Sequence, residues 1–422
     1  MKEGAFYRAM WRWHFYAGLI VLPVLAIMAV TGALYLYKPE IERIVYRDRI
    51  VLPPGGAMLA PSRLVAAVER AAGAPVTQIV RPPSDGESWR LRVRSDGGRA
   101  TTWFVDPHDG RILGRMEGGG VMDLVRDIHS LALTGPVGNR LVEVVAGWAI
   151  LLCVTGLYLR WPRRGQPALA LRGRASGRLF WRDLHGTLGF LSAAVILFLA
   201  VTGMPWTEVW GGGLQRLVAA NNMGRPKLAE LPWTEPAKQA LPWSLREGGA
   251  LPGGVGGIGV DEAMRTAAAR GVTGGYTLVL PAAPGLPYLV ATTVVRAQDA
   301  RALMIDAGSG AVVQDMDWRM FGRGAQAVEW GIATHQGQEY GEANRLLMLA
   351  GCLCLLLLCL TAPVLWWKRR RNGRLAEPPA ATPAAKRVVA ALMLLVGLLF
   401  PLTGLSMVAA LLGEWGVGRM RA

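Results

Sequence analysis

The chain has 422 residues, of which 52% are hydrophobic and 18% charged, and its mean hydropathy is +0.29. This composition excludes an ordinary soluble enzyme and favours a membrane protein with additional water-soluble mass. The net charge of +16 lies mainly in short loops between apolar stretches instead of on one folded face, so we expect a lipid bilayer and no nucleic acid as partner.

Five stretches are long and apolar enough to cross a hydrocarbon layer about 30 Å thick, which needs roughly 20 helical residues. They lie at 15–37, 139–161, 186–207, 345–367 and 387–411. The first ends in YLYKPEIE without a small-residue cleavage site, so we expect a retained helix. Basic segments follow the second and fourth stretches. The positive-inside rule therefore predicts a cytoplasmic N-terminus, external segments at 38–138 and 208–344, and an external C-terminus.

The apolar stretches repeat. HFYAGLIVLPVLAIMAVTG, from His14, matches HGTLGFLSAAVILFLAVTG, from His185. A second match joins the segments HSLALTGPVGNRL, from His129, and HQGQEYGEANRL, from His335. Such a parallel repeat would put equivalent residues at equivalent membrane depths.

Both external segments contain the same predicted elements. In the first, LVAAVERAA (64–72) predicts a helix, and three strand-like runs lead to the turn DPHDG at 106–110. In the second, EAMRTAAARG leads through similar runs to DAGSG at 306–310. We therefore expect two small α+β modules, with His108 exposed in the first turn.

A stretch rich in glycine and proline precedes the second module and has no counterpart in the first half. It carries four tryptophans, Trp206, Trp210, Trp233 and Trp243. One interpretation is a loop with an aromatic belt at the membrane interface. The other is a lid over an external ligand site.

The histidines form two predicted pairs. A single histidine near a helix end is most simply an interfacial residue. The topology, however, places His14 and His185 near the cytoplasmic face, as an inner pair, and His129 and His335 near the external face, as an outer pair. Two neutral imidazoles suit the axial positions of an iron porphyrin, whereas zinc or copper would want three or four protein ligands. We therefore expect two haem sites.

Other residues were considered around these sites. Gly18, Gly186 and Gly189 would let a flat macrocycle approach the backbone, although ordinary helix packing explains them equally well. Five arginines stand near the histidines and are candidate propionate partners, or simply flank the helices. They are Arg12, Arg182, Arg126, Arg140 and Arg345.

Several motifs together resemble the PepSY-associated transmembrane family of bacterial inner-membrane proteins. They are WRWHFYAGLIVLPVLAIMAVTGALY, WRDLHGTLGFLSAAVILFLAVTG, FVDPHDGRILG, IHSLALTG and THQGQEYG. The resemblance implies an α-helical integral membrane protein with about five transmembrane helices from a parallel internal repeat and two small periplasmic α+β PepSY modules. It also implies two haem b groups with His14, His129, His185 and His335 as iron ligands. Members of the family include siderophore-linked reductases.

The expected organisation alternates membrane and external parts. It comprises helix 1 (1–38), PepSY module 1 (39–121), the segment of His129 with helix 2 (122–162), a basic loop (163–182), helix 3 (183–207), the Trp/Gly/Pro-rich loop (208–256), PepSY module 2 (257–322), the segment of His335 with helix 4 (323–368), a second basic loop (369–386), and helix 5 with its tail (387–422).

The expected function is transmembrane electron transfer from a cytoplasmic reductant to a periplasmic acceptor, which would make the protein an oxidoreductase of the ferric-siderophore reductase type. The sequence lacks a G-x-G-x-x-G segment after a strand, so we expect a separate donor such as reduced flavin or a flavoprotein. Two alternatives remain: a transporter for iron, a siderophore or another metal, and an interaction protein that acts through its PepSY modules without redox activity. No catalytic residue is assigned.

Overall fold

The computed structural model describes residues 4–94, 100–162, 169–221, 223–224, 231–246, 248–370 and 382–420. Residues 163–168 and 371–381, which belong to the two predicted basic loops, lie outside the described residues. The chain forms two compact units. A helical unit comprises the residues up to Leu36, Val125–Leu214 and the residues from His335 onwards, and a sheet unit comprises Tyr37–Leu124 and Gln215–Thr334.

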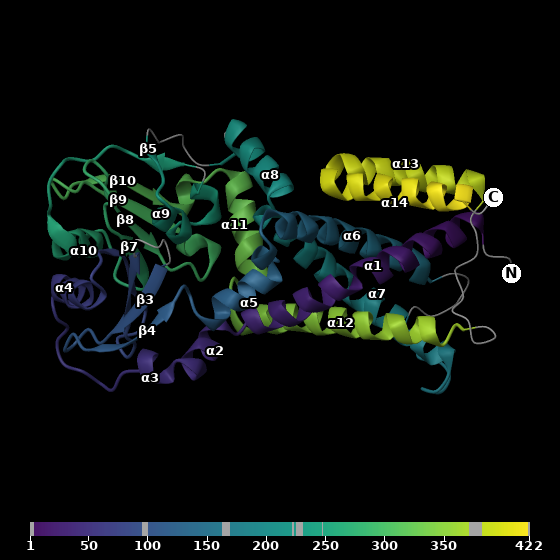
Figure 1. Ribbon diagram of the computed structural model, residues 1–422, viewed down its shortest axis with the longest axis horizontal. Helices are drawn as coiled ribbons and strands as arrows, with labels where there is room; N and C mark the ends of the chain where they lie inside the picture. The colour runs from purple at the N-terminus through teal and green to yellow at the C-terminus, as the bar shows by residue number, and fades with distance from the viewer. Residues whose placement is uncertain are drawn as a thin grey trace. The chain divides into compact units, whose positions relative to one another are not determined.

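Among the described residues, four helices of the helical unit are long and apolar enough to cross a membrane. They are α1 (Ala5–Tyr35), α6 (Pro136–Arg160), α7 (Arg178–Gly203) and α12 (Gly341–Trp367). Figure 1 shows these four helices packed along one another. Large apolar side chains such as Leu191 and Leu360 remain exposed on their outer faces, as expected for helices whose outer surface meets lipid. Apolar helices long enough to span are therefore confirmed at the first four predicted stretches.

The fifth predicted span is wrong as a single helix. It is divided into α13 (Pro383–Leu399) and α14 (Pro401–Met420). Pro401 has no amide proton and its ring would clash with the carbonyl four residues earlier, which ends a helix. Yet α1 continues through Pro23, so proline alone does not decide the outcome in this chain.

The two helices after residue 382 form a hairpin. They lie side by side in Figure 1, and the backbones of Gly397 and Gly404 are in close contact near the turn. Because α14 runs back along α13, it ends at the end of the unit where α13 begins.

The sheet unit contains one continuous antiparallel sheet of eight strands, where the sequence predicted two separate small sheets. Its order is β10-β9-β8-β7-β1-β2-β3-β4. The strands are β1 (Val76–Arg81), β2 (Trp89–Arg94), β3 (Ala100–Val105), β4 (Ile112–Glu117), β7 (Tyr276–Val279), β8 (Tyr288–Thr292), β9 (Arg301–Ile305) and β10 (Val312–Asp317). The halves join where β1 pairs with β7, with Ile79 opposite Leu278. Edge strands pair through backbone N–H and C=O groups, so the side chains of β1 and β7 do not reveal in the sequence that the two sheets join.

One face of the sheet carries the core. Helices α4 (Pro61–Ala72) and α10 (Gly259–Ala269) contribute buried side chains such as Leu64 and Ala263 to a cluster with Leu91 and Leu278. Strand β2 shows the reason, because its buried residues alternate with arginines. A strand places successive side chains on opposite faces, so its arginines point away from this core.

The turn at 106–110 corrects one expectation. Asp106 accepts a hydrogen bond from the His108 amide, and Gly110 has a φ of 76°, which favours glycine. The His108 ring, however, is not exposed. It packs against Gly55, and both ring nitrogens are buried without a hydrogen-bond partner among the described residues. The closeness of Gly55 could not be seen in the turn sequence.

The tryptophan-rich segment is folded. It contains α8 (Val209–Ala220), β5 (Leu231–Pro232), α9 (Glu235–Ala240) and β6 (Gly249–Ala250). Trp233 and Trp243 are buried, and Trp233 donates a hydrogen bond to the Leu245 carbonyl. Trp210 stacks on Phe400. Because Trp233 and Trp243 are buried and Trp210 is half-buried against Phe400, these three rings do not form the exposed aromatic surface that the lid interpretation required.

Candidate functional site

The helical unit brings the four predicted histidines together in two pairs. His14 lies on α1 and His185 on α7, and their rings are close enough to interact electrostatically. His129 ends α5 (Val121–His129) and His335 ends α11 (Arg323–His335), and these two rings also interact. Each pair therefore combines one residue from each half of the chain.

Each histidine ring is held by a threonine from another helix. In all four cases the imidazole Nδ1 and the threonine Oγ1 lie within hydrogen-bond distance. The pairs are His14 with Thr155 at 2.9 Å, His185 with Thr361 at 2.8 Å, His129 with Thr31 at 2.9 Å and His335 with Thr202 at 2.9 Å. Two of these threonines, Thr31 and Thr202, stand in the repeated AVTG motif, but nothing in the sequence connects them to the histidines.

The hydrogen bonds of the threonines assign the imidazole proton. Thr31 donates its hydroxyl proton to the Ile27 carbonyl at 2.6 Å, and Thr155 donates to the Leu151 carbonyl at 2.7 Å. The other two threonines do the same with carbonyls three or four residues earlier. A hydroxyl has only one proton, so each threonine must accept the bond from the histidine. Nδ1 of each histidine therefore carries a proton, and Nε2 keeps its lone pair when the ring is neutral.

The environment of the second pair favours neutral rings. Removal from water lowers the pKa of His129 and lowers the pKa of His335 to about 3. Desolvation acts in this direction because the charged imidazolium loses more hydration energy than the neutral ring. A neutral imidazole with a free Nε2 is the form that binds metal ions.

Glycine follows three of the four threonines and leaves room for the rings. A Cβ on Gly156 would lie 3.2 Å from Cε1 of His14, and one on Gly32 would lie 3.4 Å from Cε1 of His129. At Gly203 the distance to Cε1 of His335 would be 3.6 Å. The repeated Thr-Gly sequence is thus a support for a histidine, with the hydroxyl as acceptor and the glycine as a close backbone surface.

Helices α1 and α7 each serve both pairs. On α1, His14 belongs to one pair and Thr31 holds a histidine of the other. The same is true of His185 and Thr202 on α7. The histidine and the threonine are equally spaced on both helices, and the spacing corresponds to about 25 Å along a helix axis. This geometry explains why the two segments share histidine at one end and AVTG at the other.

The donor set fits a porphyrin iron. Each site offers two imidazoles whose Nδ1 donates to a threonine, and the described residues contain no group of three or more His, Cys, Asp or Glu side chains that could hold a metal ion. A haem needs only two axial ligands from the protein. Hydrogen bonds that orient a ligand histidine through its second nitrogen are typical of metal sites.

The glycines and arginines predicted around the histidines have other contacts. A Cβ on Gly18 or Gly189 would meet a leucine of a neighbouring helix, as ordinary helix packing requires. Four of the five candidate propionate partners pair with acidic side chains, and the fifth, Arg12, lies over the ring of Tyr16. The four pairs are Arg182 with Asp183, Arg126 with Asp127, Arg140 with Glu208 and Arg345 with Glu342.

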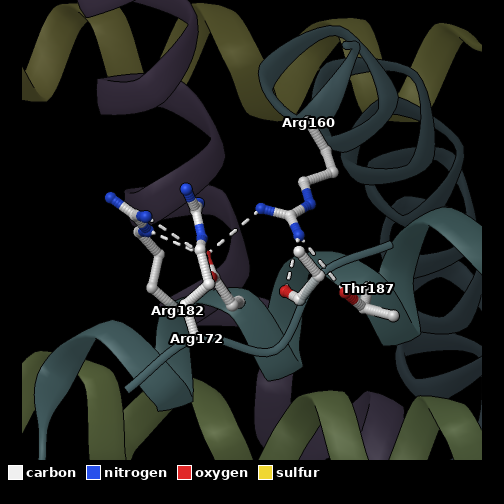
Figure 2. Close-up of polar contacts among 6 residues, drawn as sticks. Arg160, Arg172, Arg182 and Thr187 are labelled. Carbon is white, nitrogen blue, oxygen red and sulfur yellow. Dashed lines mark hydrogen bonds and ion pairs between the residues drawn. The ribbon is translucent and has the colours of Figure 1, made fainter. Parts of the chain in front are cut away.

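Two further arginines, which the sequence analysis did not select, lie near His185. Arg160, at the end of α6, and Arg172 both bind the buried carboxylate of Asp183 (Figure 2). Gly186 makes this possible, because a Cβ there would lie 2.9 Å from Cδ of Arg160. In the sequence, the feature that indicates this cluster is the high density of arginine between residues 160 and 182.

An aromatic ring also contacts the second pair. Trp206 follows α7 in a short 3-10 turn, η2 (Met204–Trp206), and meets the His335 ring edge-to-face at 5.7 Å between centroids. Trp206 is partly exposed, so its ring lies between the His335 ring and the surface of the helical unit. Of the four tryptophans considered for a lid, this one contacts a candidate ligand.

The sheet unit has its own polar cavity of about 190 Å³. It lies over the face of β1, β2 and β3 that carries the arginines of β2. Its charged lining residues are Lys38, Glu42, Arg90, Arg92 and Asp123. Glu42 is shared by Lys38 and Arg90. Three cations against two carboxylates make this cavity suited to a small polar anion rather than to an apolar ligand.

The comparisons agree with the resemblance drawn from the motifs. The search of curated proteins gives no match. A family model described as a PepSY-associated TM region matches residues 11–369, a range that contains α6, α7, α12, most of α1 and all four paired histidines. The chain therefore belongs to the family of membrane proteins with a PepSY-associated transmembrane region.

Proposed function

We propose that the chain is an oxidoreductase of the bacterial inner membrane that transfers electrons from a cytoplasmic reductant to a periplasmic acceptor. His14 and His185 would hold one haem b, and His129 and His335 a second. A haem with two imidazole ligands supplies reversible one-electron chemistry and leaves no open position for oxygen. The donor is reduced flavin or a flavoprotein, and the acceptor is a ferric siderophore, whose iron is reduced to the ferrous state and released.

The observation that carries this proposal is the set of four histidine–threonine hydrogen bonds. Threonine and glycine fix the ring and its tautomer at both ends of the helical bundle, which a merely interfacial histidine would not require. The two levels, separated by about 25 Å of helix, would provide stations near both sides of a hydrocarbon layer about 30 Å thick. Transport of a substrate gives no reason for paired imidazoles at both levels.

The chain's own residues have distinct tasks in this account. The histidines bind through Nε2, the threonines keep the proton on Nδ1, and the glycines allow close approach of the helix backbone. Trp206 shields His335 from water on one side. The apolar faces of α1, α6, α7 and α12 exclude water between the two levels, which prevents side reactions along the path.

A proteoliposome assay tests the function. The protein is reconstituted with a ferric hydroxamate siderophore and a ferrous-specific chromogenic chelator inside, and reduced flavin is added outside. We expect the ferrous complex to form inside, and His14→Ala or His129→Ala to reduce its rate at least tenfold. His108→Ala, which alters a histidine of the sheet unit, is the matched control. Unchanged rates in both ligand variants would contradict the proposal.

A further inference from the structure

Asp183 is the centre of a cluster of three arginines, two residues before His185. Its carboxylate is fully buried. Arg172 binds it through Nε at 2.7 Å and Nη2 at 3.3 Å, and Arg182 binds it through Nε at 3.3 Å and Nη2 at 3.1 Å. Arg160 reaches the same carboxylate with Nη1 at 3.4 Å. Figure 2 labels the three arginines and Thr187 and draws the polar contacts of this cluster as dashed lines.

The third arginine also secures the turn that carries His185. Nη2 of Arg160 donates to the Thr187 hydroxyl at 3.2 Å and to the Ala170 carbonyl at 3.3 Å. With its bond to Asp183 before the histidine and its close contact at Gly186 after it, the Arg160 guanidinium contacts residues on both sides of His185. The cluster is therefore part of the same local structure as the His14–His185 pair.

The cluster has more positive charge than its carboxylate can balance. Three guanidinium groups surround one Asp183, which leaves a surplus of two charges. The side chains of Arg172 and Arg182 are 41% and 54% exposed, whereas that of Arg160 is 15% exposed. The Nη1 groups of Arg172 and Arg182 are not used in binding Asp183. Like charges this close repel one another, so a second anion on the exposed side would be favourable.

We propose that this cluster binds the phosphate group of a soluble phosphorylated redox cofactor, such as flavin mononucleotide, which delivers electrons to the His14–His185 site. The inference rests on the proposed function and names the donor class for that site. Arginine recognises phosphate through several N–H donors of one guanidinium, and the Nη1 groups of Arg172 and Arg182 are left for this by their contacts with Asp183. Asp183 is a positioning residue that holds the guanidiniums together. A phosphate bound here would put the attached ring system beside His185.

Equilibrium binding of oxidised flavins to the detergent-purified protein tests the inference without any electron transfer. We expect flavin mononucleotide to bind at least tenfold more tightly than riboflavin, which lacks the phosphate, and the advantage to shrink as salt rises. Arg172→Gln should bring the two affinities within about threefold of each other, and Arg182→Gln should have a similar effect. Arg265→Gln, an exposed arginine paired with one glutamate in the sheet unit, is the matched control.

Three results would overturn the proposal. Equal binding of both flavins by the natural protein would show that the cluster does not read phosphate. An unchanged preference in both Arg172→Gln and Arg182→Gln would place the phosphate elsewhere. A lipid phosphate is the competing source of the same chemistry. The ligand is a lipid if flavin mononucleotide binding is suppressed in phosphatidylglycerol nanodiscs but not in phosphatidylcholine nanodiscs. In that case Arg172→Gln should also remove the phosphatidylglycerol that the purified protein retains.

The same samples separate this inference from the proposed function. Haem content is measured in parallel by pyridine haemochrome analysis, and circular dichroism confirms that the arginine variants are folded. A protein without haem that still prefers flavin mononucleotide would retain the phosphate site while removing the electron-transfer account. A protein with two haems and no preference for flavin mononucleotide would keep the electron-transfer account and remove the phosphate site.

Discussion

Thr31 accepts a hydrogen bond from His129 at 2.9 Å while it donates its own proton to the Ile27 carbonyl at 2.6 Å. The relationship fixes the direction of the bond, because the hydroxyl has no second proton to offer. The same arrangement occurs at the other three histidines. It is the most specific feature of the helical unit, because ordinary helix packing needs neither the acceptor nor the fixed tautomer.

Replacing this acceptor should weaken one haem site and leave the other intact. Thr31→Val keeps the shape of the side chain but removes the hydroxyl, so His129 loses its orienting partner. We expect haem affinity at the His129–His335 site to fall about 10–100-fold, the range for losing such a support. Titration of the apoprotein with haem, followed by absorption, measures the two sites. Thr31→Ser should retain most of the affinity; equal loss in both variants would mean that the hydroxyl is not the cause.

The glycine after the threonine should matter according to its distance from the ring. A Cβ at position 156 would lie 3.2 Å from His14, which requires the ring to move, whereas one at position 203 would lie 3.6 Å from His335, an ordinary contact. We therefore expect Gly156→Ala to lower occupancy of the His14–His185 site and Gly203→Ala to have little effect. Haem content and low-spin reduced spectra of the two variants decide this, and the opposite order would contradict the packing argument.

A carboxylate in the sheet unit predicts how stability depends on pH. The backbone amides of Gly254 and Ser309 and the Ser309 hydroxyl lower the pKa of Asp306 from its ordinary 3.8 to about 2. A lowered pKa stabilises the folded state above pH 3.8, and this contribution is lost as pH falls through about 2. Denaturant unfolding of the natural protein and Asp306→Asn should therefore differ by a constant amount between pH 5 and 7. This difference in unfolding free energy should decrease below about pH 4. If it increased in acid instead, the lowered pKa of Asp306 would be contradicted.

The sequence predicted the features that depend on local pattern. Four apolar helices and both histidine pairs could be predicted because hydropathy and the repeat are properties of the chain itself. The threonine partners could not, since His185 and Thr361 are separated by 176 positions and His14 and Thr155 by 141. Their meeting depends on how four helices pack, which no single helix encodes.

Other differences arise from contacts between distant segments. The predicted fifth span fails at Pro401, whereas α1 continues through Pro23, so the same residue type has two outcomes that depend on its neighbours. The joining of the two half-sheets is decided by the edges of β1 and β7, whose backbone groups pair regardless of side-chain type. His108 is hidden because Gly55, far away in the chain, offers space for its ring.

The most direct test of the central claim is the haem content of the purified protein, measured per chain with its oxidised and dithionite-reduced spectra. We predict two non-covalent haems with sharp low-spin reduced bands. His14→Ala and His185→Ala should each remove the same haem, and His129→Ala and His335→Ala should each remove the other. A natural protein without haem, or single variants that all retain two, would contradict the assignment of these four histidines.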